Sequence, residues 1–177
     1  MIAPMNARVE KALREAIGSV PHVEAEQIAA PLAALNDRER AEALGLAIII
    51  TCYVAVDACD SQWPVESSMR RIAEDLATTS TTAERLHLDA GEIYTYLSRT
   101  VLGSERLEDV ISDEPTFTRL PIIVAGEALA VYSPKGMGMW DNLDRIESAI
   151  ETASALDASV LPAAVMRAYL PEQEAGR

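Results

Sequence analysis

Apolar side chains recur at intervals of three and four residues in several separate stretches of the chain, which is the spacing of one face of an α-helix. This pattern predicts helices over residues 6–17, 23–35, 64–76, 89–102, 122–132, 139–154 and 160–169. Pro31 falls inside the second of these stretches, so a kink or a fresh start is expected there.

The stretch from Asp37 to about Cys59 is different, because it begins charged and then becomes apolar on every side. A helix that is apolar all round is buried all round, so we expect it to be the central helix of a bundle. Asn36 with Glu39 three residues later predicts a capping box at its start. The β-branched residues of segment 48–56 leave a strand open as an alternative, and segment 120–124 has the same ambiguity.

These patterns together predict one all-α domain over residues 1–177. The domain is expected to be a bundle of about seven or eight helices around the buried apolar helix at about 37–59. The sequence shows no internal repeat and no shift in composition that would divide the chain. An alternative leaves residues 1–35 as a loosely attached helical arm, and residues 171–177 are expected to form a frayed tail.

The net charge of the protein limits the classes of partner that we expect it to bind. The 177 residues include 28 acidic and 15 basic side chains, for a net charge of −13. A surface of this sign repels nucleic-acid phosphates and anionic membranes, so neither is expected to bind directly, whereas a basic protein partner is favoured. The alternative explanation is that the negative charge serves only to keep the protein soluble.

The two cysteines, the start of the chain and the most apolar run each bear on where in the cell the protein is located. Cys52 and Cys59 are seven residues apart in one predicted helix, about 10 Å along its axis, which is too far for a disulfide. Free thiols suit a reducing cytoplasm. No signal peptide is expected at the start of the chain. The most apolar run, 44–56, is shorter than the roughly 20 residues that span a bilayer.

The loop from Tyr132 to Trp140 carries Lys135, Gly136 and Gly138, which at first sight suggest a phosphate cradle. The lysine, however, precedes the glycines, no Ser or Thr follows them, and a third glycine is absent, so neither known phosphate-loop pattern is present. We therefore interpret the loop as a turn between two helices, with Trp140 packing the second helix onto the core.

Metal and acid–base chemistry have weak support. Glu84 and His87 have the E-x-x-H spacing of helical metal sites, but the only other histidine, His22, lacks a matching glutamate, so no metal and no cofactor are predicted. Asp57 and Asp60 are the carboxylate pair best placed for catalysis. We interpret them as part of an ion pair at a helix end, with Arg70 and Arg71 as candidate partners.

Acidic side chains gather in two places that could dock a partner. One, here called the acidic strip, lies at helical spacing beside an apolar helix face and comprises Asp144, Glu147 and Glu151. The other, here called the acidic connector, comprises Glu105, Glu108, Asp109, Asp113 and Glu114. Either is also explained as a solvated surface.

No family is identified from specific residues. The leading functional hypothesis is a non-enzymatic cytoplasmic protein–protein interaction module, of the immunity or inhibitor type, that binds a basic partner through its acidic surface. A second hypothesis is a helical sensor that holds a small apolar ligand between residues 44–56 and 122–131. A third is a carboxylate-dependent enzyme that uses Asp57. A homo-oligomer is compatible with all three.

Overall fold

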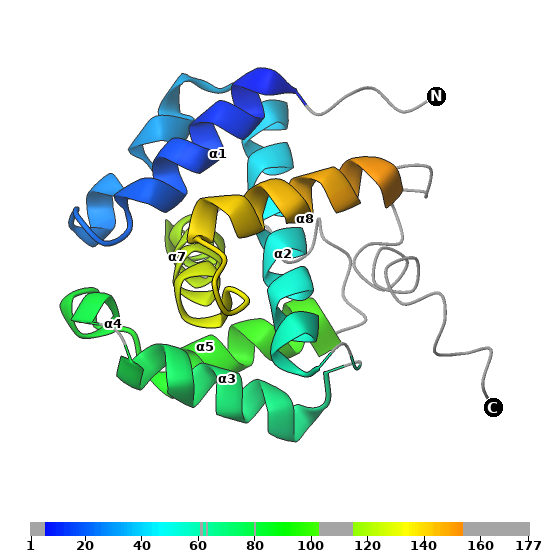
Figure 1. The fold of residues 1–177 in the computed structure, drawn as a ribbon. Helices are drawn as coiled ribbons and strands as arrows, with labels where there is room; N and C mark the ends of the chain where they lie inside the picture. Colours follow the sequence, from blue (N-terminus) through cyan, green and yellow to red (C-terminus); the bar gives the residue numbers. More distant parts are fainter. Residues whose placement is uncertain (1–5, 61, 63, 80, 103–114, 154–177) are drawn as a thin grey trace.

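The apolar stretch that follows Asn36 forms α2 (Asp37–Ala58), which runs through the middle of the computed structural model (Figure 1). The structure describes residues 6–60, 62, 64–79, 81–102 and 115–153. Every regular element among them is helical, which confirms the predicted all-α bundle with a buried apolar helix. Segments 48–56 and 120–124, for which the sequence left a strand open, are both helical.

The remaining elements differ from the predicted ones in detail. They are α1 (Ala7–Ser19), the 3₁₀ turns η1 (Ala25–Gln27) and η2 (Ala30–Ala34), α3 (Glu66–Thr79), α4 (Thr81–Arg85), α5 (Ala90–Leu97), the π-helical turn η3 (Ser98–Leu102), α7 (Pro115–Tyr132) and α8 (Met139–Ala153). In place of the continuous helix predicted over 23–35 there are two short 3₁₀ turns, and the second begins with Pro31 in its first turn, so the fresh start expected there is confirmed. The predicted helix at 160–169 and the tail at 171–177 lie outside the described residues.

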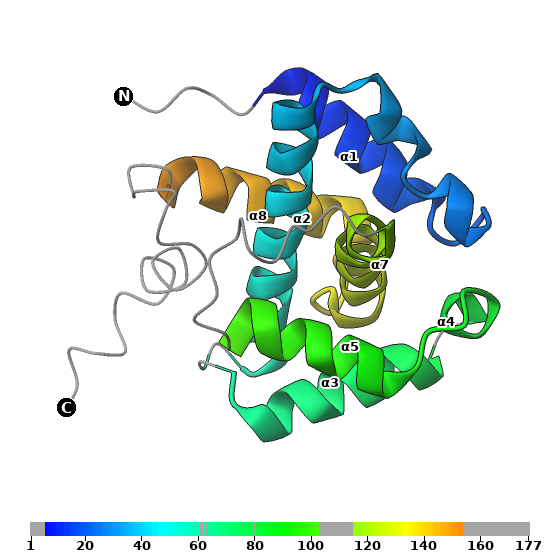
Figure 2. The same ribbon diagram turned by 180° about the vertical axis from the view of Figure 1, so that it is seen from behind.

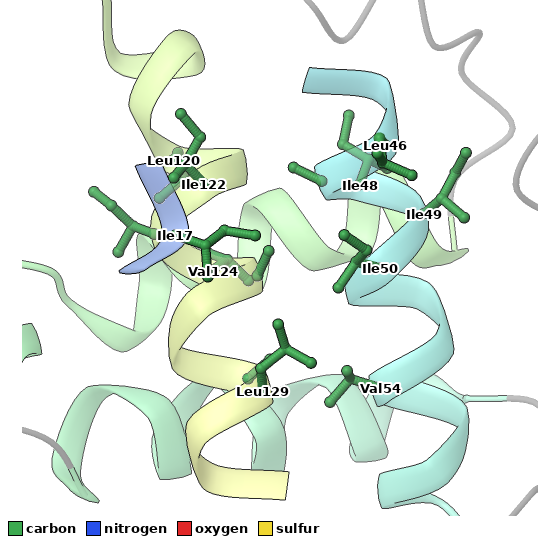
Figure 3. Close-up of a cluster of buried hydrophobic side chains, with 14 of the residues drawn as sticks. Ile17, Leu46, Ile48, Ile49, Ile50, Val54, Leu120, Ile122, Val124 and Leu129 are labelled. Atoms are coloured by element: carbon green, nitrogen blue, oxygen red, sulfur yellow. The ribbon is translucent and has the colours of Figure 1, made fainter. Parts of the chain in front are cut away.

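Helix α7 lies alongside α2 and covers one side of it (Figure 3). Ile122, Val124 and Leu129 of α7 are buried in the same core cluster as Ile50 and Val54 of α2. Helix α8 crosses α2 near its middle, while α3 and α5 lie next to each other towards its carboxyl end (Figures 1 and 2). The central helix is therefore covered from several directions, as an all-round apolar helix requires.

Helix α1 belongs to the core. Val9, Leu13 and Ile17 on its inner face are at most 1% exposed and pack with the residues of α2 and α7. Within the segment 1–35, for which the sequence leaves a loosely attached arm open, α1 packs on the bundle.

Helix α2 is also long and apolar enough to cross a membrane by length and composition alone. In this structure, however, 78% of its most apolar window is buried inside the protein. A core helix of a folded domain passes the same length and composition test, and the burial of α2 is what such a core helix shows.

One carboxylate joins the starts of α1 and α2. The predicted capping box is present: the Glu39 amide donates to Asn36 Oδ1 at 2.9 Å, and the Asn36 amide donates to Glu39 Oε2 at 3.1 Å. The other carboxylate oxygen of Glu39 accepts from Arg8 Nη1 at 3.1 Å and from Asn6 Nδ2 at 3.3 Å. Because Asn6 is the N-cap of α1, Glu39 fixes both helix starts relative to each other.

We expect Glu39→Ala to lower the free energy of unfolding by about 1–3 kcal/mol, because it removes one half of the capping box and deprives Asn6 Nδ2 and Arg8 Nη1 of an acceptor. Urea denaturation followed by circular dichroism measures this. Glu42→Ala is the matched control, since Glu42 is exposed on the same helix, and it should change the value by less than about 0.5 kcal/mol. Equal effects of the two substitutions would contradict the role given to Glu39.

Candidate functional site: a groove between α5 and α7

A groove of about 650 Å³ opens between α5 and the first turns of α7. In Figure 2, α5 crosses the near side of the molecule and α7 lies above it. The volume is within the range of pockets that hold small molecules. The groove is lined by Ala25, Leu86, His87, Leu88, Asp89, Gly91, Glu92, Thr95, Tyr96, Arg99, Arg119, Leu120 and Ile123.

The lining separates into an apolar floor and a polar rim. The floor consists of buried side chains: Leu86, Tyr96, Leu120 and Ile123. The rim is exposed to solvent and consists of His87, Asp89, Gly91, Glu92 and Thr95. Arg99 of η3 and Arg119 of α7 are half-buried between the two. A buried apolar floor with a few polar groups around it is the usual composition of a ligand pocket.

Helical spacing explains how α5 forms one wall. Leu88, Glu92, Thr95 and Arg99 follow one another at three- and four-residue intervals, so they share a face. An N-cap fixes where α5 begins, because Asp89 Oδ1 accepts from the Glu92 amide at 3.0 Å. A Cβ at position 91 would lie 2.9 Å from that same oxygen, so Gly91 leaves room for the cap.

Tyr96 connects the floor to the central helix. Its ring lines the groove, and its hydroxyl is buried next to Thr51 and Cys52 of α2 without a hydrogen bond of good geometry. Burial raises the pKa of Tyr96 well above its usual range. Burial likewise raises the pKa of Cys52 to about 12, so this thiol stays protonated and unreactive at neutral pH.

His87 has an unusual backbone for its residue type. Its φ is +54°, in the left-handed region. The Leu88 amide donates to the Ala83 carbonyl at 3.0 Å and the His87 amide to the Glu84 carbonyl at 3.2 Å, which is the Schellman pattern that ends α4. Glycine is the residue that this position normally holds, since an L side chain is strained there. An imidazole is instead kept at this position on the groove rim.

We expect His87→Gly to raise the free energy of unfolding by about 0.5–1 kcal/mol, because glycine adopts this backbone without strain. His87→Ala should lower the free energy of unfolding or leave it unchanged, because alanine keeps a Cβ at the strained backbone position. Thermal and urea denaturation of the two variants measure the difference. A glycine variant less stable than the alanine variant would contradict the backbone strain assigned to this position.

The acidic strip is partly used inside the molecule. Arg14 of α1 donates to Asp144 Oδ1 at 2.5 Å and also to Glu147. Glu147 is only 6% exposed, so it joins α1 to α8 and presents little surface to a partner. Asp144 and Glu151 are exposed. The acidic connector, with Glu105, Glu108, Asp109, Asp113 and Glu114, lies outside the described residues.

Burial raises the pKa of Glu147, and the bond from Arg14 offsets this only in part. For Arg14, burial alone would lower the pKa, but the bonds to Glu147 and Asp144 more than reverse it. Loss of contact with water outweighs the attraction to Arg14, so the pKa of Glu147 stays above its ordinary value.

A carboxyl whose pKa is raised by folding binds more protons in the folded state. The free energy of unfolding should therefore fall as pH rises from the ordinary value of 4.5 through the raised pKa of Glu147. We expect Glu147→Gln to remove this component, so that stability falls less steeply above pH 4.5 than in the unmodified protein. Urea denaturation at several pH values from 4 to 7 measures the slopes, and a steeper slope in the variant would contradict the assignment.

Asp57 forms an ion pair at the end of α2, as the sequence indicated, but with a different partner. It accepts from Arg145 of α8, which also donates to Asn142 Oδ1 at 2.8 Å. The sequence suggested Arg70 and Arg71 instead. Arg71 donates to the Ala58 carbonyl at 2.9 Å, and Arg70 pairs with Glu66 at 2.8 Å. Arg145 was not among the candidates that the sequence suggested, because α8 is distant in sequence but packs against α2.

The loop between α7 and α8 is a turn. Gly136 has a φ of +84°, and the Met137 amide donates to the Pro134 carbonyl at 2.9 Å. A carboxylate oxygen of Asp141 lies 3.3 Å from where a Cβ on Gly138 would be, so an acidic group already occupies the start of α8. The Trp140 ring lies against Gly18 at the end of α1, where a Cβ would be 3.3 Å away, and remains 40% exposed.

The structure adds no support for a metal site at Glu84 and His87. Both side chains are exposed at the end of α4. Among the described residues, no group of three or more His, Cys, Asp or Glu side chains could hold a metal ion.

Where the sequence predicts a ligand pocket, between residues 44–56 and 122–131, α2 and α7 pack on each other and their buried side chains belong to one core cluster (Figure 3). Of those residues, the α5–α7 groove uses only Ile123. Sequence reasoning missed the groove because its floor comes from segments far apart in the chain. The stripe formed by Leu88, Thr95 and Arg99 was the available signal.

Comparison with known proteins leaves the groove as the main guide to function. No protein-family model matches the chain, and neither a curated protein nor a solved structure matches it.

Proposed function

We propose that this protein is a non-enzymatic binding protein that holds a small, largely apolar ligand in the α5–α7 groove. One observation carries the proposal: a groove of about 650 Å³ has a buried apolar floor and an exposed polar rim. Water in contact with such a floor is released when an apolar ligand replaces it, and this release favours binding.

The hypothesis of a basic protein partner stays a prediction. It rests on the net charge of −13 and on an acidic connector outside the described residues. The ion pair with Arg14 already engages Asp144 and Glu147, which reduces what the acidic strip offers to a partner. The groove therefore has the stronger support.

The enzyme hypothesis and the cytoplasmic location also stay predictions. Asp57 is bonded to Arg145, and an arginine-bound carboxylate at a helix end has a structural role without any catalysis. Cys52 and Cys59 are both free, which is what a reducing compartment maintains.

The proposal is tested with N-phenyl-1-naphthylamine, an uncharged apolar dye that fluoresces when it leaves water. We expect saturable binding of the dye to the purified full-length protein. Thr95→Trp should weaken it at least about tenfold, because Thr95 is exposed on the rim and an indole there covers the floor. Fluorescence titration measures both affinities.

Thr78→Trp is the matched control. Thr78 is exposed on α3, and its hydroxyl donates to the carbonyl four residues earlier, as that of Thr95 does. It does not line the groove. The control should bind the dye like the unmodified protein. No saturable binding by the unmodified protein, or an equal loss in both variants, would refute the proposal.

A further inference from the structure

We infer that the ligand of the groove is an amphipathic anion: a free molecule with an apolar body and a carboxylate or similar anionic head. This inference rests on the proposed function and adds the chemical class of the ligand. The body would lie on Leu86, Tyr96 and Ile123, and the head would be bound by the guanidinium groups of Arg99 and Arg119.

The two arginines are the first part of the argument. They approach the groove from different elements, Arg99 from η3 and Arg119 from the start of α7, and each is half-buried next to the apolar floor. A guanidinium has five N–H donors, so it can bind an anionic head while keeping other partners. In such partly dehydrated surroundings, a charge-assisted hydrogen bond to a carboxylate is among the stronger polar contacts.

The opposing charges on the rim are weaker. Asp89 and Glu92 also line the groove, but both are exposed and therefore screened by water and salt. Asp89 is in addition occupied as the N-cap of α5. Along α5 and η3, Glu92 and Arg99 are seven residues apart, which separates their backbones by about 10 Å along the helix axis.

The net charge of the protein strengthens the argument that these arginines bind an anionic ligand. In a protein of net charge −13, only 15 side chains are Lys or Arg, and two of them line this one groove. The same net charge repels an anionic membrane surface. We therefore assign the groove to a free amphiphile and not to a lipid in a bilayer.

Competition against bound N-phenyl-1-naphthylamine tests the head group. Decanoate, decan-1-ol and decyltrimethylammonium share a ten-carbon chain and differ in charge. We expect decanoate to displace the dye at about tenfold lower concentration than the other two. In Arg99→Gln/Arg119→Gln, decanoate and decan-1-ol should displace the dye at equal concentrations, each taken relative to that variant's own affinity for the dye. Arg99→Lys/Arg119→Lys, which keeps the charge, should restore part of the decanoate advantage.

The three compounds are compared within one variant, so a change in that variant's affinity for the dye leaves the comparison valid. Equal displacement by all three compounds, or a decanoate advantage that survives the double Gln substitution, would overturn this inference and leave the proposed function standing. Failure of the dye to bind at all would instead overturn the proposed function. Arginine-dependent sedimentation with phosphatidylglycerol vesicles would overturn the assignment to a free molecule.

Discussion

The need to cover α2 on all sides is the constraint on which the rest of this structure depends. From Ala43 to Val56 every residue of this helix is buried. A helix with no polar face cannot lie at a surface, so other helices must surround it. Helices α1, α7 and α8 pack on it directly, and α3 and η3 contact it as well. The hydrophobic effect thus accounts for the presence of a bundle.

Apolar packing alone does not fix which helix lies where, and a small set of polar bonds between distant segments adds that information. Glu39 links the starts of α1 and α2, Arg145 links α8 to the end of α2, and the Tyr132 hydroxyl donates to Asp75 of α3 at 2.5 Å. Each joins two elements that the chain separates widely. These bonds set the geometry in which the groove arises: α7 packs on α2, α5 packs on α3, and the space between α5 and the start of α7 stays open.

The fold class could be predicted because its signals are local. The apolar run of α2, its capping box at Asn36 and the N-cap at Asp89 each depend on residues within one or two turns. What could not be predicted depends on contacts across the chain. The partner of Asp57 is 88 positions away, and the partner of Arg14 at Glu147 is 133 positions away. Such a contact buries Glu147, and this burial limits how much of the acidic strip a partner could reach.

The central claim is that the space between α5 and α7, and not the interface of α2 with α7, receives a ligand. Backbone amide shifts of ¹⁵N-labelled protein, recorded as N-phenyl-1-naphthylamine is added, test it most directly. The account predicts that the amides that move belong mainly to residues 86–99 and 119–123. Shifts centred on residues 44–56 and 124–131, or no saturable shifts, would contradict it.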